Sequence, residues 1–373
     1  PGSGVVHDMC GLEAVQNMTP ARSNITAGRD TRIPVLMITH ARPAYLKRAL
    51  ASVFKHRASK DQFPVTASQD GDDVGVARIL EEHLRDGELA RLLRFSPPDA
   101  LLVKGNAKRR PIQGYKRLAA HYKWALGQMF VEVGVDHLII LEEDLEVAPD
   151  FFDYFLATLP LLQSDPCLFC VSAWNDNGKA EIASDPRAVF RTDFFPGLGW
   201  MLRRPFWQEI QARWPEAFWD DFVRRQDVRR GRHCLRPEVN RAFTFGEVGV
   251  SRGQFFKKHL AKIALNKEAV DWASMNLSFV SSARSFDAYV AKEVAASERV
   301  SGLEPLRSLA PPGVPRSFVV TYSLGEWTAT ARFFGLMEDA KDGIRRGTYR
   351  GVLPLAWQGH RVWLVSDWPL RKK

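Results

Sequence analysis

The chain has 373 residues, of which 45% are hydrophobic and 25% are charged, and its formal net charge at pH 7 is +9. This length suits one large α/β domain with a smaller one, and the sequence contains no low-complexity tract or repeat. The positive charge favours anionic partners such as nucleotides or phosphates. No nucleic-acid-binding motif accompanies it, so we expect no nucleic acid partner. No apolar segment approaches the roughly 20 residues that cross a bilayer.

Residues 1–30 are polar and lack periodicity, which is typical of a stem or linker. Residues 1–4 resemble a tag remnant, so a natural N-terminal anchor could have been removed. N-glycosylation sequons at Asn17, Asn24 and Asn276 favour a secretory lumen only weakly, because each arises easily by chance. The four cysteines form no metal-site pattern, since Cys167 and Cys170 lack a second pair at similar spacing.

Apolar strands alternate with helices along the first half of the chain. We expect strands over residues 33–39, 65–69, 137–141 and 168–173. We expect helices that open at Pro43, run over 112–131 and follow Pro149. On the 112–131 helix, Arg117 and His121 share a face one turn apart. This alternation predicts a doubly wound, mostly parallel sheet.

Three acids, Glu142, Glu143 and Asp144, directly follow the apolar run 138–141. Such a run suits a strand buried on both faces of a parallel sheet, and these sheets bind ligands at the carboxyl ends of their strands. Clustered carboxylates repel each other unless a cation or hydrogen-bond donors balance them. Their hard oxygen atoms suit Mg²⁺ or Mn²⁺, which usually arrive with a phosphate-bearing substrate. A solvated acidic turn is the alternative interpretation.

The second half of the chain carries two further candidate segments. Residues 214–221 predict a helix with Asp220 and Asp221 in its first turn. The helix dipole is one explanation for these acids, and a catalytic base is another. The glycine-rich segment 246–253 could be a mobile lid or only a loop. From about residue 283 the pattern changes and suggests a small second α+β unit.

The stretch 141–152, Leu-Glu-Glu-Asp-Leu-Glu-Val-Ala-Pro-Asp-Phe-Phe, is similar to the acidic metal motif of the glycosyltransferase family that holds N-acetylglucosaminyltransferase I. The similarity extends from about residue 33 to the C-terminus and is weakest after 283. Further long motifs carry it at 113–116, 120–128, 171–178, 191–200, 218–221, 236–238 and 253–256. The resemblance implies a GT-A type catalytic domain that binds a nucleotide sugar. The implied parts are the stem over 1–30, the catalytic domain over 31–245, a donor-closing loop and linker over 246–282, and a small C-terminal α+β domain over 283–373.

The resemblance also implies a role for individual residues. Asp144 matches the acid that contacts Mn²⁺ beside the diphosphate of UDP-GlcNAc, and Asp220 matches the base of an inverting transfer. Asp221 is adjacent, and the sequence by itself does not separate the two aspartates. The other matches are donor contacts: Asp70 and His121 at the uridine, Arg42 near the diphosphate, Glu142 and Glu143 at the sugar and ribose, Leu198 and Trp219 at the GlcNAc pocket, and Val250 and Ser251 in a loop that orders over the donor.

The acceptor that the resemblance implies is the α1,3-linked mannose of a high-mannose N-glycan, which receives GlcNAc in β1,2 linkage. The implied location is the Golgi lumen, in a type II membrane protein whose anchor is absent from this chain. Glu143 stands where N-glycan members usually have Asp, and protein O-mannose β1,2-GlcNAc transferases also carry Glu-Glu-Asp. Transfer to O-linked mannose is therefore the alternative. A catalytically silent sugar-binding protein is a third hypothesis, which the presence of both Asp144 and Asp220 disfavours.

The family pairs the cysteines that match Cys170 and Cys234, so the resemblance implies a disulfide there. The partners of a second common family bridge are both replaced, by His40 and Gly71. Cys10 and Cys167 have no family counterpart, and either a free thiol or a stem crosslink remains open for them.

Overall fold

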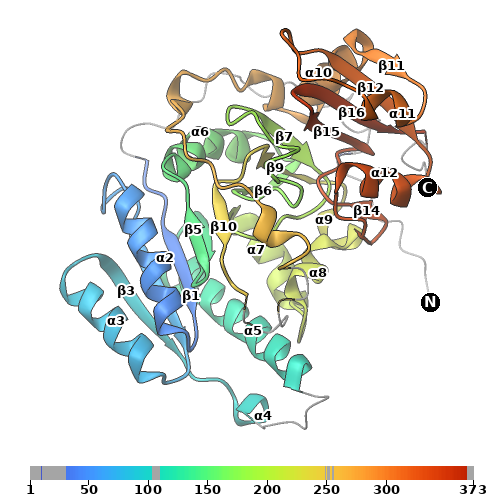
Figure 1. The fold of residues 1–373 in the computed structure, drawn as a ribbon. Coiled ribbons are helices and arrows are strands. Elements are labelled where there is room, and N and C mark those ends of the chain that lie inside the picture. Colours follow the sequence, from blue (N-terminus) through green and yellow to red (C-terminus); the bar gives the residue numbers. More distant parts are fainter. Residues whose placement is uncertain are drawn as a thin grey trace.

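The computed structural model describes residue 10 and residues 31–102, 110–247, 249, 253 and 256–367. An eight-stranded sheet forms the centre of the larger unit, in the order β3-β2-β1-β4-β8-β6-β9-β7 (Figure 1). Its strands are β1 (Val35–Thr39), β2 (Val65–Asp70), β3 (Leu89–Phe95), β4 (His137–Glu142), β6 (Leu168–Ser172), β7 (Val189–Thr192), β8 (Trp200–Arg203) and β9 (His233–Pro237). Only β7 and β8 run against the other six. The predicted α/β class with a mostly parallel sheet is confirmed.

Helices cover both faces of this sheet, each over its own apolar core. Val35 and Met37 of β1 belong to one core, whereas Leu36 and Ile38 belong to the other, as the alternation of side chains along a strand requires. The first core packs α2 (Pro43–His56), α3 (Val74–Arg85) and α6 (Phe151–Ser164). The second packs α5 (Arg110–Gly127), α7 (Arg204–Ile210) and α8 (Trp219–Arg224). Because the central strands are covered twice, they need apolar residues at successive positions, which explains their unbroken runs.

The shorter elements connect the sheet to the site. An antiparallel pair, β5 (Leu145–Val147) with β10 (Ala242–Thr244), lies directly beyond the end of β4. The helix α5 continues into a π-helical turn, Gln128–Val133, so the helix expected over 112–131 is present. The helix expected from residue 214 begins only at Trp219, after a separate 3₁₀ turn, Gln211–Arg213. The short helices α4 (Asp99–Leu102) and α9 (Gln226–Arg229) complete this unit.

A second, smaller unit follows, as the change of pattern near residue 283 predicts (Figure 1, orange to red). Its four strands are arranged in the order β11 (Glu298–Val300), β12 (Ser317–Tyr322), β16 (His360–Ser366) and β15 (Val352–Trp357). Its helices are α10 (Ala283–Ala296), α11 (Glu304–Arg307) and α12 (Trp327–Phe334). A hairpin of β13 (Ala340–Lys341) and β14 (Ile344–Arg345) lies between α12 and β15. The domain boundaries stated above remain predictions.

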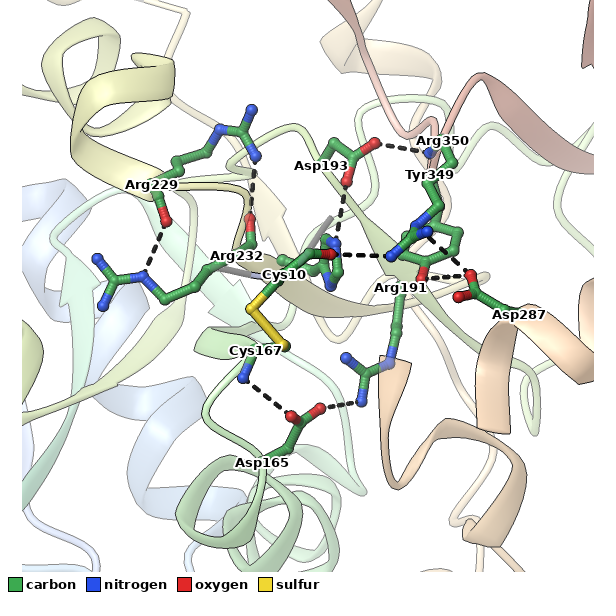
Figure 2. The surroundings of a disulfide bond; sticks show 11 residues. Cys10, Asp165, Cys167, Arg191, Asp193, Arg229, Arg232, Asp287, Tyr349 and Arg350 are labelled. Atoms are coloured by element: carbon green, nitrogen blue, oxygen red, sulfur yellow. Dashed lines mark hydrogen bonds and ion pairs between the residues drawn. A yellow bond between two sulfur atoms is a disulfide. The ribbon is translucent and has the colours of Figure 1, made fainter. Parts of the chain in front are cut away.

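Two disulfides hold the chain. Cys170 is bonded to Cys234, which joins the neighbouring strands β6 and β9 and agrees with the pairing implied by the resemblance. Cys10 is bonded to Cys167, so the stem crosslink is present and neither cysteine is a free thiol. Figure 2 shows that this second bond lies beside Arg350 of the C-terminal unit, whose side chain donates to the backbone carbonyl of Cys10 at 2.9 Å. The bond therefore fastens the N-terminal segment where the two units meet.

Among the described residues, no helix combines the length and the apolar character that crossing a bilayer requires.

Candidate active site

The carboxyl ends of three adjacent parallel strands meet at one edge of the sheet. β1 pairs with β2 on one side and with β4 on the other, so the residues after Thr39, Asp70 and Glu142 lie next to each other. The chain order of the strands reverses here, and open α/β sheets bind their ligands outside such a switch point. The predicted site residues of the first half of the chain gather at this edge.

Glu143 is tied to the end of β1. Its buried carboxylate accepts a hydrogen bond from the hydroxyl of Thr39, one from the backbone N–H of His40 at 2.8 Å, and one from Nε of Arg42 at 2.6 Å. Both oxygens of this carboxylate are thus bound by protein donors. A structural role for Glu143 follows directly from these contacts, whereas its expected contact with the donor sugar stays a prediction.

Asp144 lies beside Arg42 and under a loop. Nη1 of Arg42 donates to Oδ2 of Asp144 at 3.0 Å, so one guanidinium bridges Glu143 and Asp144. Gly246, just after β10, passes so close that a Cβ there would collide with Oδ2 of Asp144. Burial raises the pKa of Asp144, and the charge of Arg42 offsets part of that effect. Glycine at position 246 therefore allows the loop to approach the carboxylate without covering it with a side chain.

Glu142 faces the opposite side of the strand and meets α5. Its Oε1 accepts a hydrogen bond from the hydroxyl of Tyr122 at 2.7 Å. Burial, and then the charge of Asp144, raises the pKa of Glu142 to about 7, although Tyr122 and Arg42 act in the other direction. Three adjacent carboxylates with one arginine leave this edge short of positive charge. The acidic stretch is therefore a largely buried cluster, and the solvated turn considered as the alternative is not what forms.

Asp70 ends β2, and only one of its two carboxylate oxygens has a hydrogen-bond partner in the described protein. Nε of Arg117 donates to its Oδ2 at 2.7 Å, and Nδ1 of His40 lies 3.5 Å from the same atom. Its Oδ1 is buried and has no hydrogen-bond partner in the described protein. A buried acceptor without a donor is costly, so a ligand N–H group would be stabilised there. His40 and Gly71, which replace the second family disulfide, are also neighbours, since a Cβ on Gly71 would lie 3.9 Å from the His40 ring.

His121 lies on α5 beneath this edge. Its Nε2 is 2.7 Å from the hydroxyl of Ser68, and its ring stacks on Phe95 at 5.2 Å between centroids. Burial, followed by the nearby charges of His40 and Arg117, lowers the pKa of His121 to about 3. The imidazole is therefore neutral at physiological pH.

The helix α8 brings Trp219, Asp220 and Asp221 to the other side of the site. Trp219 is buried and stacks on Tyr122 at 4.2 Å, and Arg224 donates to Oδ2 of Asp220. Phe218, which precedes the helix, has a φ of 54°, an uncommon value for a bulky residue that costs about 1–3 kcal/mol. Such backbone strain clusters at functional sites, and here it sets the position from which α8 starts.

Tyr122 connects the two acidic segments. Its hydroxyl binds Glu142, its ring lies against Trp219, and after burial itself the charges of Glu142, Asp144 and Asp220 all raise its pKa. Asp144 and Asp220 therefore lie around one phenol, although 76 positions separate them in the chain. The sequence prediction that both aspartates face one site requires this arrangement.

Three other predicted donor contacts, Leu198, Val250 and Ser251, are less informative. Leu198 is half-buried and packs against the first core. Val250 and Ser251 lie outside the described residues, so their expected place over the donor stays a prediction. The sequence predictions did not include Tyr122, Arg224 or Lys341, which lies in the smaller C-terminal unit. Tyr122 adjoins His121 within a matched motif, and that adjacency was the available signal.

A divalent cation at this edge would have Asp144 as its candidate protein ligand. Oδ2 of Asp144 already accepts a hydrogen bond from Arg42 and lies against the backbone of Gly246, and the acidic cluster has a negative excess that Arg42 alone does not balance. Within the described residues, no group of three or more His, Cys, Asp or Glu side chains is placed to hold a metal. Most ligands of such an ion would therefore come from phosphate and water.

Comparison with known proteins gives the family. The model of the GNT-I family matches residues 6–372, and the chain belongs to this family. The alpha-1,3-mannosyl-glycoprotein 2-beta-N-acetylglucosaminyltransferase of Arabidopsis thaliana is 37% identical over 339 residues, which are 89% of this chain and 73% of that protein. The family predicted from the sequence motifs is confirmed.

Solved structures share parts of the architecture at low identity. The mannosyltransferase PcManGT from Pyrobaculum calidifontis, in complex with GDP-Man and Mn2+, aligns with a TM-score of 0.40 and 15% identity over 75% of this chain and 80% of its own. Residues 1–349 of S. aureus TarS, in complex with UDP, align with a TM-score of 0.39 and 11% identity over 55% of this chain and 58% of that chain.

Proposed function

We propose that this protein is an inverting N-acetylglucosaminyltransferase that moves GlcNAc from UDP-GlcNAc to the α1,3-linked mannose of high-mannose N-glycans, in β1,2 linkage. Membership of the GNT-I family and the name of the Arabidopsis relative support transfer of GlcNAc and the N-glycan acceptor. The observation that carries the mechanism is the position of Asp144 and Asp220 around Tyr122.

The donor would lie along the edge formed by β2, β1 and β4. The unpartnered Oδ1 of Asp70 suits an N–H group of the uracil base, and Arg42 would bring its planar charge to the diphosphate. Asp144 would hold Mn²⁺, and the ion when bound would offset the charge that develops on the departing UDP. The short loop after β10 would lie over this group, since Gly246 already approaches Asp144.

Asp220 is the better candidate for the base because of what binds its neighbour. Asp221 has both oxygens engaged by cations, Oδ1 by Arg224 at 3.0 Å and Oδ2 by Lys341 at 3.0 Å. Burial would raise the pKa of Asp221, but Lys341 and Arg224 outweigh it and the pKa is lowered. A carboxylate held in this way is a weak proton acceptor. Asp220 shares only Arg224 and would take the proton of the acceptor hydroxyl as it attacks the anomeric carbon.

We propose the Golgi lumen as the location, in a type II membrane protein whose anchor precedes the present chain. The two disulfides support an oxidising compartment, because such bonds persist in the secretory pathway and are rare in the cytosol.

The test is a transfer assay with UDP-GlcNAc and a panel of mannosides, with the linkage of the product determined by NMR. The expected product is β1,2-GlcNAc on the α1,3-linked mannose of an N-glycan, formed only when Mn²⁺ is present. A preference for mannosyl peptide would instead assign the chain to O-mannose transfer. Glu143 is the residue of the acidic motif that departs from the usual N-glycan members. It does not decide between the two acceptors, because protein donors bind its carboxylate.

Two variants test the roles of the acids. We expect Asp220→Asn to lower turnover by about 100-fold or more while UDP-GlcNAc binding stays near normal, since a general base contributes about 10²–10⁴-fold. Asp144→Ala should weaken the metal-dependent binding of UDP-GlcNAc itself, measured by calorimetry with and without Mn²⁺. Asp227→Asn, at a partly exposed ion pair on α9, is the matched control and should change neither quantity. Normal turnover in Asp220→Asn would mean that another residue is the base.

A further inference from the structure

The hairpin of β13 and β14 is fixed onto the helices that carry the candidate base. Its turn residues, Asp342 and Gly343, both have positive φ, 48° and 78°, as a tight two-residue hairpin turn requires. Oδ2 of Asp342 accepts a hydrogen bond from the backbone N–H of Gln226 at 2.5 Å, and its carbonyl accepts one from Nε2 of Gln226 at 3.1 Å. Gln226 is the first residue of α9, directly after α8. The hairpin therefore places Lys341 at a defined position beside α8.

Lys341 completes a group of two acids and two cations. Its Nζ donates to Oδ2 of Asp221 at 3.0 Å, and Arg224 donates to Oδ1 of Asp221 at 3.0 Å and to Oδ2 of Asp220. Arg224 is itself held by the carbonyl of Phe195 at 3.2 Å. The two negative charges are thus matched by two positive ones, and one of those comes from the smaller C-terminal unit.

Removing Lys341 would leave one guanidinium to serve two carboxylates. Arg224 would then be drawn toward Asp221 and away from Asp220, and the pKa of Asp221, which Lys341 helps to lower, would rise. The titratable or charged groups that face Asp220 and Asp221 in the described structure are Arg224 on α8, Lys341 on the hairpin, and Tyr115 and Tyr122 on α5. Burial, followed by the charges of Asp220 and Asp221, raises the pKa of Tyr115, so the tyrosine stays neutral.

We propose that Lys341 is a positioning residue for the transfer reaction: it holds Asp221 in place so that Arg224 remains on Asp220 and keeps that carboxylate oriented toward the acceptor. The proposal rests on the function proposed above, in which Asp220 takes the acceptor proton. It gives the C-terminal unit a part in the reaction through one side chain that acts on Asp221. Lys341 is partly exposed on its hairpin, with 39% of its side chain accessible, so replacing it leaves the apolar cores intact.

The experiment compares Lys341→Met and Lys341→Arg with the unmodified protein. The rate kcat and the KM values for UDP-GlcNAc and for the mannoside acceptor are measured from pH 5 to pH 9. For Lys341→Met we expect kcat to fall several-fold throughout this range, because Arg224 would no longer be held on Asp220. The KM for UDP-GlcNAc should stay unchanged, and Lys341→Arg should restore most of the profile. Lys60→Met, at an exposed ion pair with Glu88, is the matched control and should behave as the unmodified protein.

Two results would overturn the proposal. One is a Lys341→Met profile that superimposes on that of the unmodified protein in both height and position. The other is a loss of kcat that is accompanied by a raised KM for UDP-GlcNAc and is not recovered in Lys341→Arg, which would show a merely structural role. Failure of the base assignment itself is distinguishable, because it appears as normal turnover in Asp220→Asn whatever Lys341→Met does.

Discussion

The buried, neutral His121 makes a specific prediction about stability at low pH. In the unfolded chain a histidine has a pKa near 6.5, whereas burial and then the charges of His40 and Arg117 lower the pKa of His121 in the native state to about 3. At a pH between these two pKa values, the histidine binds a proton in the unfolded state but not in the native state. Native stability from this residue is therefore complete above pH 6.5 and is lost as the pH falls toward 3.

The magnitude follows from the two pKa values. Each pH unit in this window costs about 1.4 kcal/mol, so the loss due to His121 is about 2 kcal/mol at pH 5 and approaches about 5 kcal/mol near pH 3. Gln keeps the possibility of a hydrogen bond to Ser68 but cannot titrate. Between pH 7.5 and pH 5, the donor-free His121→Gln variant should lose about 2 kcal/mol less stability than the unmodified protein.

Urea unfolding at both pH values, followed by tryptophan fluorescence, measures this difference. The absolute cost of losing the stack on Phe95 cancels, because each protein is compared with itself at the two pH values. NMR of the His121 ring gives an independent reading and should show no titration above pH 4. Equal pH dependence in the two proteins, or a ring that titrates near pH 6.5, would refute the reasoning.

Two further predictions concern stability. Replacing Cys10 and Cys167 together by Ser removes a crosslink between positions 157 residues apart. The chain entropy of the unfolded state sets the largest expected loss of unfolding free energy at about 5 kcal/mol. Denaturation of the oxidised protein and of the variant measures this loss, and equal stability of the two would contradict the prediction. Glu143→Gln should cost about 2 kcal/mol, because an amide nitrogen would face donors such as Arg42 in a buried site. The partly exposed Glu146→Gln is its control and should change stability by less than about 0.5 kcal/mol, so equal losses in both variants would argue against the Glu143 network.

Much of the larger unit could be predicted from local patterns. The runs that became β1, β4 and β6 are unbroken because both faces of the sheet are covered, and that property is visible without a structure. The strands β3, β7, β8 and β9 were missed as elements, and length alone is not the reason, since β1 and β6 were predicted and have five residues each. Two of these four strands, β7 and β8, run against the sheet, an arrangement that no local pattern encodes.

The candidate site divides in a similar way. The sequence by itself determined the strands whose ends carry Asp70 and the acids of 142–144, since a strand's own residues specify where it ends. The sequence also determined the family, because each of the long motifs is a continuous stretch of residues. The contacts that favour Asp220 over Asp221 as the proposed base are visible only in the tertiary structure. They depend on Lys341, a cation 120 positions from Asp221 in the chain, and electrostatic environment is a property of neighbours in space.

The same reason applies to the remaining cysteines and to Glu143. Only the fold shows that Cys167 lies beside Cys10 and that the end of β1 binds the carboxylate of Glu143, whose expected contact with the donor stays a prediction. Secondary structure follows from the order of residues along the chain. Charge balance, crosslinks and the division of labour among identical side chains follow from which segments meet, and only the folded chain specifies that.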